Sequence, residues 1–277
     1  MKNGRSTIIF VVVILLVFFG LLTYKFTSER VKGDTIDVSH VILNEEFFSV
    51  MNAKELIHYK IMNSIDFFTT ATGKFQRIDL PNKLEEEVTY QVDVKNRRGY
   101  SHITNTDNDQ DLEILCSNGI NLQFDNIKKT YKENKIEVLA KDKDLKKLKP
   151  INRFSKKDGY LARSDNEYLL GTEDSLFNQS VACSYLNNYS NWSITGEEKY
   201  MGIDCVKIVG VMESTGKTHE NNFILIVDKS TGIILKSQDL DMNGKVIYSM
   251  TTESIKIDGS LDNSAFEKTV EGYSKDK

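Results

Sequence analysis

The stretch FILIVDKSTGIILKSQDLDMNGKVIYSMTTESIKID, from Phe223 to Asp258, predicts three consecutive β-strands joined by two tight turns. At the first turn, Asp and Ser side chains can bond the local backbone, and Gly232 tolerates a positive φ. At the second, Asn243-Gly244 between apolar runs predicts a type I′ turn, which needs positive φ twice. The predicted strands are Phe223–Val227, Ile233–Leu240 and Val246–Ile257. Such a meander needs a partner layer on its apolar face.

Apolar residues that alternate with polar ones extend this sheet upstream. Two arms that meet at Asn118-Gly119 form a second Asn-Gly hairpin with its apolar residues on one face. The strands predicted from period-two alternation are Val88–Val94, Gly99–Thr104, Leu112–Cys116, Ile120–Phe124, Trp192–Tyr200 and Cys205–Met212. We therefore expect one continuous antiparallel sheet with a single apolar side.

Two amphipathic helices are predicted to cover that side. The first, Asn52–Thr70, begins with an N-cap and an acidic residue at N3, and Ile57, Ile61 and Ile65 form its apolar stripe. The second, Thr172–Asn188, has acidic residues in its first turn. The fold class expected from the residues is α+β, with helices on one face of a twisted sheet.

The strand and turn motifs resemble those of the lipoprotein-carrier superfamily of LolA, LolB and RseB-like proteins. The resemblance rests on the VD..TG and DxxGK turns of the meander and on WSITGEEKYMGIDCVKI at Trp192–Ile208. The second motif is similar to a strand pair in Gram-positive, membrane-anchored and sporulation-type members. The resemblance implies an incomplete barrel whose concave apolar face is covered by helices, with a cavity between them.

The N-terminal segment predicts a membrane anchor. Residues 7–24 carry no charge, and these 18 residues (24 − 7 + 1) just suffice for a membrane helix, while Lys2 and Arg5 precede them. The alternative, a cleaved signal peptide, would need a small-residue cleavage site that is not present. We expect a cytoplasmic stub at 1–6, an anchor at Thr7–Phe26, a stalk at 27–43, an extracytoplasmic domain at 44–270 and a tail at 271–277.

Charge limits the classes of possible binding partner, and the cysteines raise the question of a disulfide. A net charge of −4 without a basic stripe argues against nucleic acid. The basic segment 141–157 is either a patch for anionic lipid or a solvated loop, and its acidic residues favour the loop. Of the three cysteines, Cys183 and Cys205 flank Trp192, and we consider a disulfide between them; the alternative is three reduced, buried thiols.

No catalytic motif is found, and the sequence suggests neither a metal site nor a cofactor. Glu55 and His58 have helical ligand spacing, but no second such pair completes a site. The candidate apolar site consists of Ile57, Ile61, Ile65, Trp192, Phe223, Leu225 and Val227, which would line either a ligand cavity or an ordinary core.

Two functions remain open, and neither is enzymatic. In the first, implied by the resemblance, the domain binds a lipid, an acyl chain or a lipidated protein as a sensor or local carrier. In the second, it is a regulatory module that binds the outer segment of another membrane protein.

Overall fold

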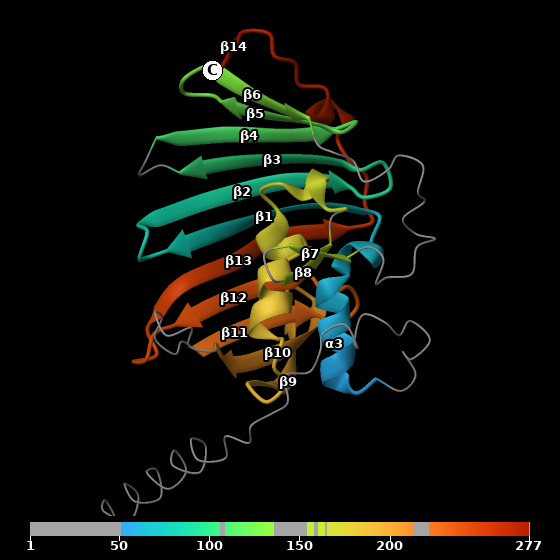
Figure 1. The fold of residues 1–277 in the computed structure, drawn as a ribbon, viewed down its shortest axis with the longest axis vertical. Coiled ribbons are helices and arrows are strands. Elements are labelled where there is room, and N and C mark those ends of the chain that lie inside the picture. Colours follow the sequence, from blue (N-terminus) through green and yellow to red (C-terminus); the bar gives the residue numbers. More distant parts are fainter. Residues whose placement is uncertain are drawn as a thin grey trace, which may run out of the picture. The chain divides into compact units, whose positions relative to one another are not determined.

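The computed structural model describes residues 51–105, 109–135, 154–157, 160–163, 165–212 and 222–276 (Figure 1). The chain divides into residues 1–35 and 36–277, and all described residues belong to the second part. The predicted stub, anchor and stalk lie outside the described residues, as does 141–153 of the basic segment. Among the residues that are described, no helix has both the length and the apolar character needed to cross a membrane.

A twelve-stranded sheet dominates the described part of the chain, in the order β14-β6-β5-β4-β3-β2-β1-β13-β12-β11-β10-β9. It consists of two meanders that the antiparallel pairing of β1 with β13 joins (Figure 1). The first meander comprises β1 (Thr70–Asp79), β2 (Leu84–Asp93), β3 (Arg98–Asn105), β4 (Gln110–Ser117), β5 (Ile120–Asp125) and β6 (Thr130–Lys135). The second comprises β9 (Trp192–Tyr200), β10 (Ile203–Val211), β11 (Asn222–Asp228), β12 (Ile234–Leu240) and β13 (Val246–Ile257).

The predicted antiparallel pairing is therefore confirmed for nine strands, β2–β5 and β9–β13, whereas the sequence did not predict β1, β6 or β14. The short strand β14 (Ser274–Lys275) pairs in parallel with β6, which makes the sheet mixed. The sheet is not closed, because β14 and β9 form its two edges. A separate hairpin consists of β7 (Phe154–Lys157) and β8 (Tyr160–Arg163).

The turns agree with the sequence at two positions and differ at a third. Asn118 and Gly119 have φ values of 54° and 74°, as the predicted type I′ turn requires, and Gly232 has a φ of 80°. The type I′ turn predicted at Asn243-Gly244 is wrong, because only Gly244 has a positive φ. The Asp241 carboxylate accepts hydrogen bonds from the Asn243 and Lys245 amides and so stabilises a three-residue loop with glycine last.

The first helix, α3 (Ala53–Met62), begins as predicted but is shorter. The Asn52 side chain accepts from the Lys54 and Glu55 amides, and Glu55 bonds back to the Asn52 amide, which completes a capping box. The predicted continuation to Thr70 is wrong. Asn63 leaves the helical conformation with a φ of −126°, and its side chain donates to the Tyr59 carbonyl. The 3₁₀ turn η2 (Ser64–Asp66) follows, and then β1.

The second predicted helix is also wrong in extent. In its place are the short helix α4 (Glu173–Leu176) and the π-helical turn η6 (Val181–Tyr185), preceded by the 3₁₀ turn η5 (Glu167–Leu169). Phe177 has φ −155° and ψ 64°, which breaks the helix, and the Asn178 side chain then accepts from the Val181 amide. Asn side chains commonly compete with helical backbone bonding in this way.

The two faces of the sheet carry different apolar clusters. The main core lies between one face and the cover formed by α3 and residues 167–186, as Figure 1 shows. On the other face, a smaller cluster of Leu115, Phe124 and Phe266 is completed by the C-terminal segment that contains η7 (Asn263–Phe266). Phe266 thus packs back onto the sheet, with the Arg98 guanidinium 4.5 Å from its ring centroid.

Candidate functional site

The seven residues of the candidate apolar site meet in the layer between the cover and the sheet. Three come from α3 and η2, one from β9 and three from β11, and their exposed fractions are between 0% and 5%. All belong to the same buried cluster: Ile57, Ile61, Ile65, Trp192, Phe223, Leu225 and Val227. The sequence therefore identified the part of this layer between α3 and the second meander, and its role as a ligand site stays a prediction.

The first meander contributes a part of the layer that the sequence did not single out. Ala71, Phe75, Val88, Tyr90 and Val92 all face the cover and are at most 2% exposed. Period two identified β2 but not β1, and only the pairing of β1 with β13 places these residues beside the apolar side chains of the second meander.

Two glycines allow close approach, Gly210 between β10 and its neighbouring side chains and Gly232 between the β11–β12 turn and α3. A Cβ atom at Gly210 would lie 2.4 Å from the Phe223 ring and 2.6 Å from Trp192 Cβ, so these two side chains occupy the space above the glycine. A Cβ at Gly232 would lie 2.3 Å from the Lys60 backbone, which shows how tightly α3 packs against the β11–β12 turn. The second meander and α3 are therefore closely packed.

A buried histidine connects α3 to η6 and the segment that follows. The two ring nitrogens of His58 lie 2.8 Å from the Ala182 carbonyl oxygen and 3.0 Å from the Tyr189 hydroxyl. Burial lowers the pKa of His58 to about 4, against a smaller opposing effect of the Ala182 carbonyl, so the imidazole is neutral at physiological pH. His58 thus acts as a neutral hydrogen-bonding link inside the cover.

Two charged side chains, of Arg163 and Lys54, form ion pairs or hydrogen bonds at the edges of the cover. Arg163 donates to both oxygens of Asp66 and of Asp165, at 2.7 to 3.1 Å, and its side chain is 2% exposed. Burial lowers its pKa, but the two carboxylates more than offset this, so the pKa of Arg163 is raised. The Lys54 ammonium donates to the Tyr189 carbonyl at 2.8 Å and to the Trp192 carbonyl.

A further link joins η6 to β12. The Tyr185 hydroxyl donates to Asp239 Oδ2 at 2.9 Å, and the Tyr185 ring lies 5.2 Å from that of Phe223. Burial raises the pKa of Asp239 to about 6, and the charge of Asp79 contributes to the increase.

Two hydroxyl groups inside the apolar layer lack hydrogen-bond partners within the described part of the chain. They belong to Tyr90 and Thr252, whose side chains are buried on β2 and β13. Burial raises the pKa of Tyr90, and the nearby Ser175 hydroxyl opposes this. Because the Ser175 hydroxyl donates its proton to the Ile234 carbonyl, it can act toward Tyr90 only as an acceptor. A buried hydroxyl without a partner costs about 1–3 kcal/mol, so each of these atoms is an available contact for a polar atom of a ligand or for water.

The three cysteines are thiols in the structure, so the disulfide considered between Cys183 and Cys205 is not formed. Burial raises the pKa of Cys116 to about 12 and the pKa values of Cys183 and Cys205 to about 11. Such thiols are poor nucleophiles at neutral pH. Across the described residues, no group of three or more His, Cys, Asp or Glu side chains is placed to hold a metal ion.

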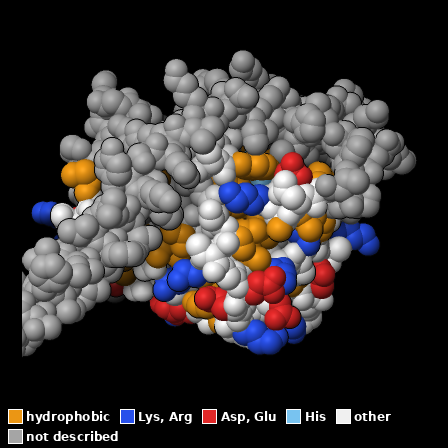
Figure 2. Space-filling model, turned by 90° about the horizontal axis from the view of Figure 1, so that it is seen from below, with side chains coloured by type: hydrophobic (Ala, Val, Ile, Leu, Met, Phe, Trp, Pro, Cys, Tyr) orange, Lys and Arg blue, Asp and Glu red, His pale blue; other side chains and the backbone are white. Residues whose placement is uncertain are grey.

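The edge strand β9 carries mostly polar side chains. Glu197, Glu198 and Lys199 are exposed there, and a bulge opposite Lys207 and Ile208 interrupts the pairing with β10. Figure 2, which looks at the molecule from below, shows acidic and basic side chains close together on the described surface, with hydrophobic side chains between them. Charges and bulges on an edge strand discourage the addition of a further strand.

Comparisons with known proteins give likenesses of fold only. No family model matches the chain, and no curated protein matches it. An uncharacterized conserved protein from Thermus thermophilus has a TM-score of 0.46 and 10% identity over 81% of this chain and 98% of its own. The MucA/MucB complex of Pseudomonas aeruginosa has a TM-score of 0.42 and 14% identity over 77% of this chain and 60% of its own. The lipoprotein LppX of Mycobacterium tuberculosis has a TM-score of 0.38 and 10% identity over 76% of this chain and 99% of its own. At these scores no function is transferred to this chain.

Proposed function

We propose that the chain is a binding protein without enzymatic activity, which takes up an acyl chain between the helical cover and the sheet. The acyl chain belongs to a lipid or to a lipidated protein. One observation carries this proposal: the apolar layer contains two buried hydroxyls, of Tyr90 and Thr252, that lack partners within the described part of the chain. An ester or amide carbonyl would satisfy such a donor, while each buried CH₂ of the chain would contribute about 0.8 kcal/mol.

The cover is suited to opening because polar contacts fasten it at several separate points. Two hydrogen bonds join the cover to β12, from Ser175 to the Ile234 carbonyl at 3.1 Å and from Tyr185 to Asp239 at 2.9 Å. The bonds of Ser64 to the Leu176 carbonyl and of Gln179 to the Met62 carbonyl connect parts of the cover to each other. Each such bond contributes only about 1 kcal/mol to the folded state. Uptake of a chain would separate the cover from the sheet without unfolding the two meanders.

The sequence adds a membrane location to this proposal. A helix at Thr7–Phe26 would anchor the protein, with the domain outside the cytoplasm. A tethered protein cannot shuttle between membranes, so the role is sensing or local transfer. The motifs at Trp192–Ile208 favour a Gram-positive, sporulation-type context.

The test is native mass spectrometry and lipid extraction on the full chain, purified in neutral detergent from a bacterium. We expect acyl lipid to remain bound at about one molecule per chain. Leu225→Asp should abolish this binding, whereas Ile224→Asp, the neighbouring and half-buried position on β11, should not. Circular dichroism on both variants distinguishes loss of ligand from loss of fold. A folded Leu225→Asp variant that retains its lipid would refute the proposal.

The alternative function, a regulatory module for another membrane protein, is supported by the close packing of the second meander. The Phe223 and Trp192 side chains already fill the space above Gly210, as a permanent core would. A folded chain that purifies without lipid would favour this alternative, and cross-linking in the native membrane would then identify the partner.

A further inference from the structure

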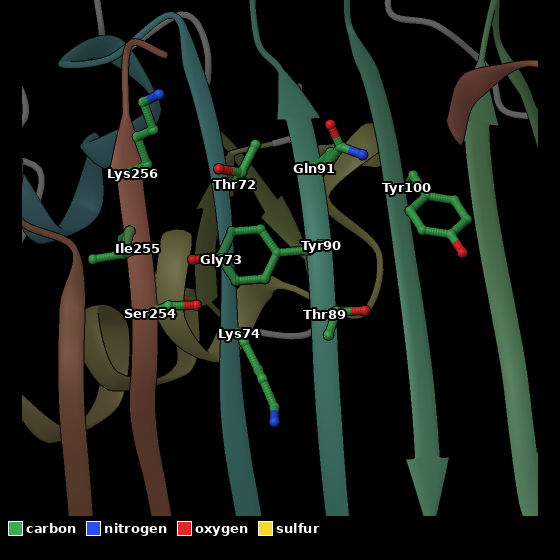
Figure 3. Close-up of a pocket in the computed structure, with 10 residues that line it drawn as sticks. All are labelled: Thr72, Gly73, Lys74, Thr89, Tyr90, Gln91, Tyr100, Ser254, Ile255 and Lys256. Atoms are coloured by element: carbon green, nitrogen blue, oxygen red, sulfur yellow. The ribbon is translucent and has the colours of Figure 1, made fainter. Parts of the chain in front are cut away.

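A polar groove crosses the face of the sheet opposite the cover. It spans β13, β1, β2 and β3, has a volume of about 480 Å³, and is drawn in Figure 3. The volume lies within the range of small-molecule sites. Side chains alternate along a strand, so the outward residues of β1 and β2 line the groove while Phe75 and Val88 face the cover. The polar lining residues therefore lie on the outer face, while Tyr90 of the apolar layer also borders the groove beside Gly73.

The strand register arranges the lining residues in rows. Thr72 is paired with Lys256 on one side and with Gln91 on the other, and Gln91 is paired with Tyr100. These four residues form a line across four strands, about 14 Å long at the usual spacing of neighbouring strands. In the next row, Lys74 is paired with Ser254 and Thr89, and the sticks in Figure 3 show both rows.

The groove offers unused hydrogen-bond donors. Within the described part of the chain, the hydroxyls of Thr72, Thr89 and Ser254 make no hydrogen bond. Gln91 Oε1 accepts from the Asp262 amide at 2.7 Å, which fixes the side chain and leaves both Nε2 protons to donate. Donors of this kind suit a ligand that is rich in oxygen acceptors.

Charge is distributed unevenly along the groove. Lys74 is paired with Glu87 at 2.7 Å and with Glu253 at 3.0 Å, so this end carries no net positive charge. Lys256, at the other end, makes no ion pair with any described residue. An anion is therefore attracted to the Lys256 end and repelled by the two glutamates at the Lys74 end.

An aromatic ring, of Tyr100 on β3, borders the groove at the side across the strands from Lys256. The Tyr100 hydroxyl donates to Glu113 at 2.9 Å, which holds the half-buried ring in place. The ring provides an apolar surface for the C–H groups of a ligand whose other groups are polar. A cation, hydroxyl and amide donors and one aromatic ring are the groups that recognise an acidic sugar.

We propose that this groove binds a sugar that carries a carboxylate or a phosphate. The anionic group lies at Lys256 and Gln91, and the sugar hydroxyls contact Thr72, Thr89 and Ser254. The sugar is either a free solute or a unit of a larger glycan. Because the groups proposed to contact the sugar all lie on the outer face of the sheet, this inference does not depend on acyl-chain binding.

The test uses the full chain in nanodiscs of phosphatidylcholine and saturation-transfer NMR of four probes: glucuronate, glucose 6-phosphate, methyl glucoside and inorganic phosphate. We expect binding of the two acidic sugars, which Lys256→Gln weakens about tenfold or more, the usual effect of losing a hydrogen bond to a charged group. Thr89→Val should weaken binding less. The matched control Lys245→Gln, an exposed lysine near the opposite end of β13, should leave it unchanged.

Several outcomes overturn the proposal. Equal binding of methyl glucoside would remove the role of the anion, and equal binding of inorganic phosphate would show an adventitious ion only. Equal losses in Lys256→Gln and Lys245→Gln would show a general charge effect rather than a site. If the acidic sugars bind, competition by a glucuronate oligomer distinguishes a glycan unit from a free solute by its higher affinity.

Discussion

Tyr90→Phe should stabilise the ligand-free protein, although it alters a fully buried core position. The Tyr90 hydroxyl is without a hydrogen-bond partner in the described part of the chain, and the residue is 2% exposed. Its removal relieves a desolvation cost of about 1–3 kcal/mol and leaves the ring packed against Phe75, 6.1 Å away. For a domain of this size, each kcal/mol raises Tm by about 2–4 °C.

The assay is thermal and urea unfolding of the delipidated chain, with Tyr189→Phe as the matched control. The Tyr189 hydroxyl bonds to His58, so its removal should lower the free energy of unfolding by about 1 kcal/mol. The two Tyr→Phe changes thus have opposite predicted signs. If Tyr90→Phe also destabilises the protein, the hydroxyl is already satisfied, and the reasoning that links it to a ligand is wrong.

Three further predictions concern the packing of the cover. The free energy of unfolding should fall by up to about 3 kcal/mol as pH drops from about 6.5 through 4. The cause is that His58 binds a proton in this range in the unfolded state but not in the folded state, where its pKa is lowered. Urea titrations should show a smaller pH dependence in His58→Gln. Arg163→Leu should cost about 3–5 kcal/mol because it removes a buried cation that pairs with both Asp66 and Asp165, and Arg163→Lys should rescue little of this in the same unfolding assay. Gly210→Ala should cost about 1–3 kcal/mol by overpacking, whereas Gly196→Ala, with no atom within 4 Å of the new methyl group, should be nearly neutral in Tm.

The sequence predicted nine of the twelve strands of the sheet because local signals determine them, but it missed β1, β6 and β14. Alternation at Val88–Val94 and the turn at Asn118-Gly119 depend on neighbours in the chain and not on distant contacts. The two long helices were wrong for a local reason that the apolar spacing does not show. Asn63 and Asn178 bond to the backbone and end or interrupt the α-helix, while apolar residues beyond them are buried in a 3₁₀ turn and a π-helical turn.

The two binding surfaces were predictable to different degrees. The apolar spacing identified Ile57, Leu225 and their neighbours because burial follows from periodicity. The outer groove was not predictable, since Thr72 and Lys256 meet only through the register of β1 with β13, which no local pattern specifies. The sequence likewise could not show that the buried Tyr90 hydroxyl lacks a hydrogen-bond partner among the described residues, because this depends on the packing around it.

Photo-cross-linking locates an acyl chain in the layer between α3 and the sheet, if one enters there. The full chain in nanodiscs is irradiated with a diazirine-bearing palmitate, and the labelled residues are mapped by mass spectrometry. We expect labels on the inward residues of α3 and β11. These labels should disappear on competition with unmodified palmitate and decrease in a folded Leu225→Asp variant. Labels confined to residues 1–35 or to the outer face of the sheet would contradict this expectation.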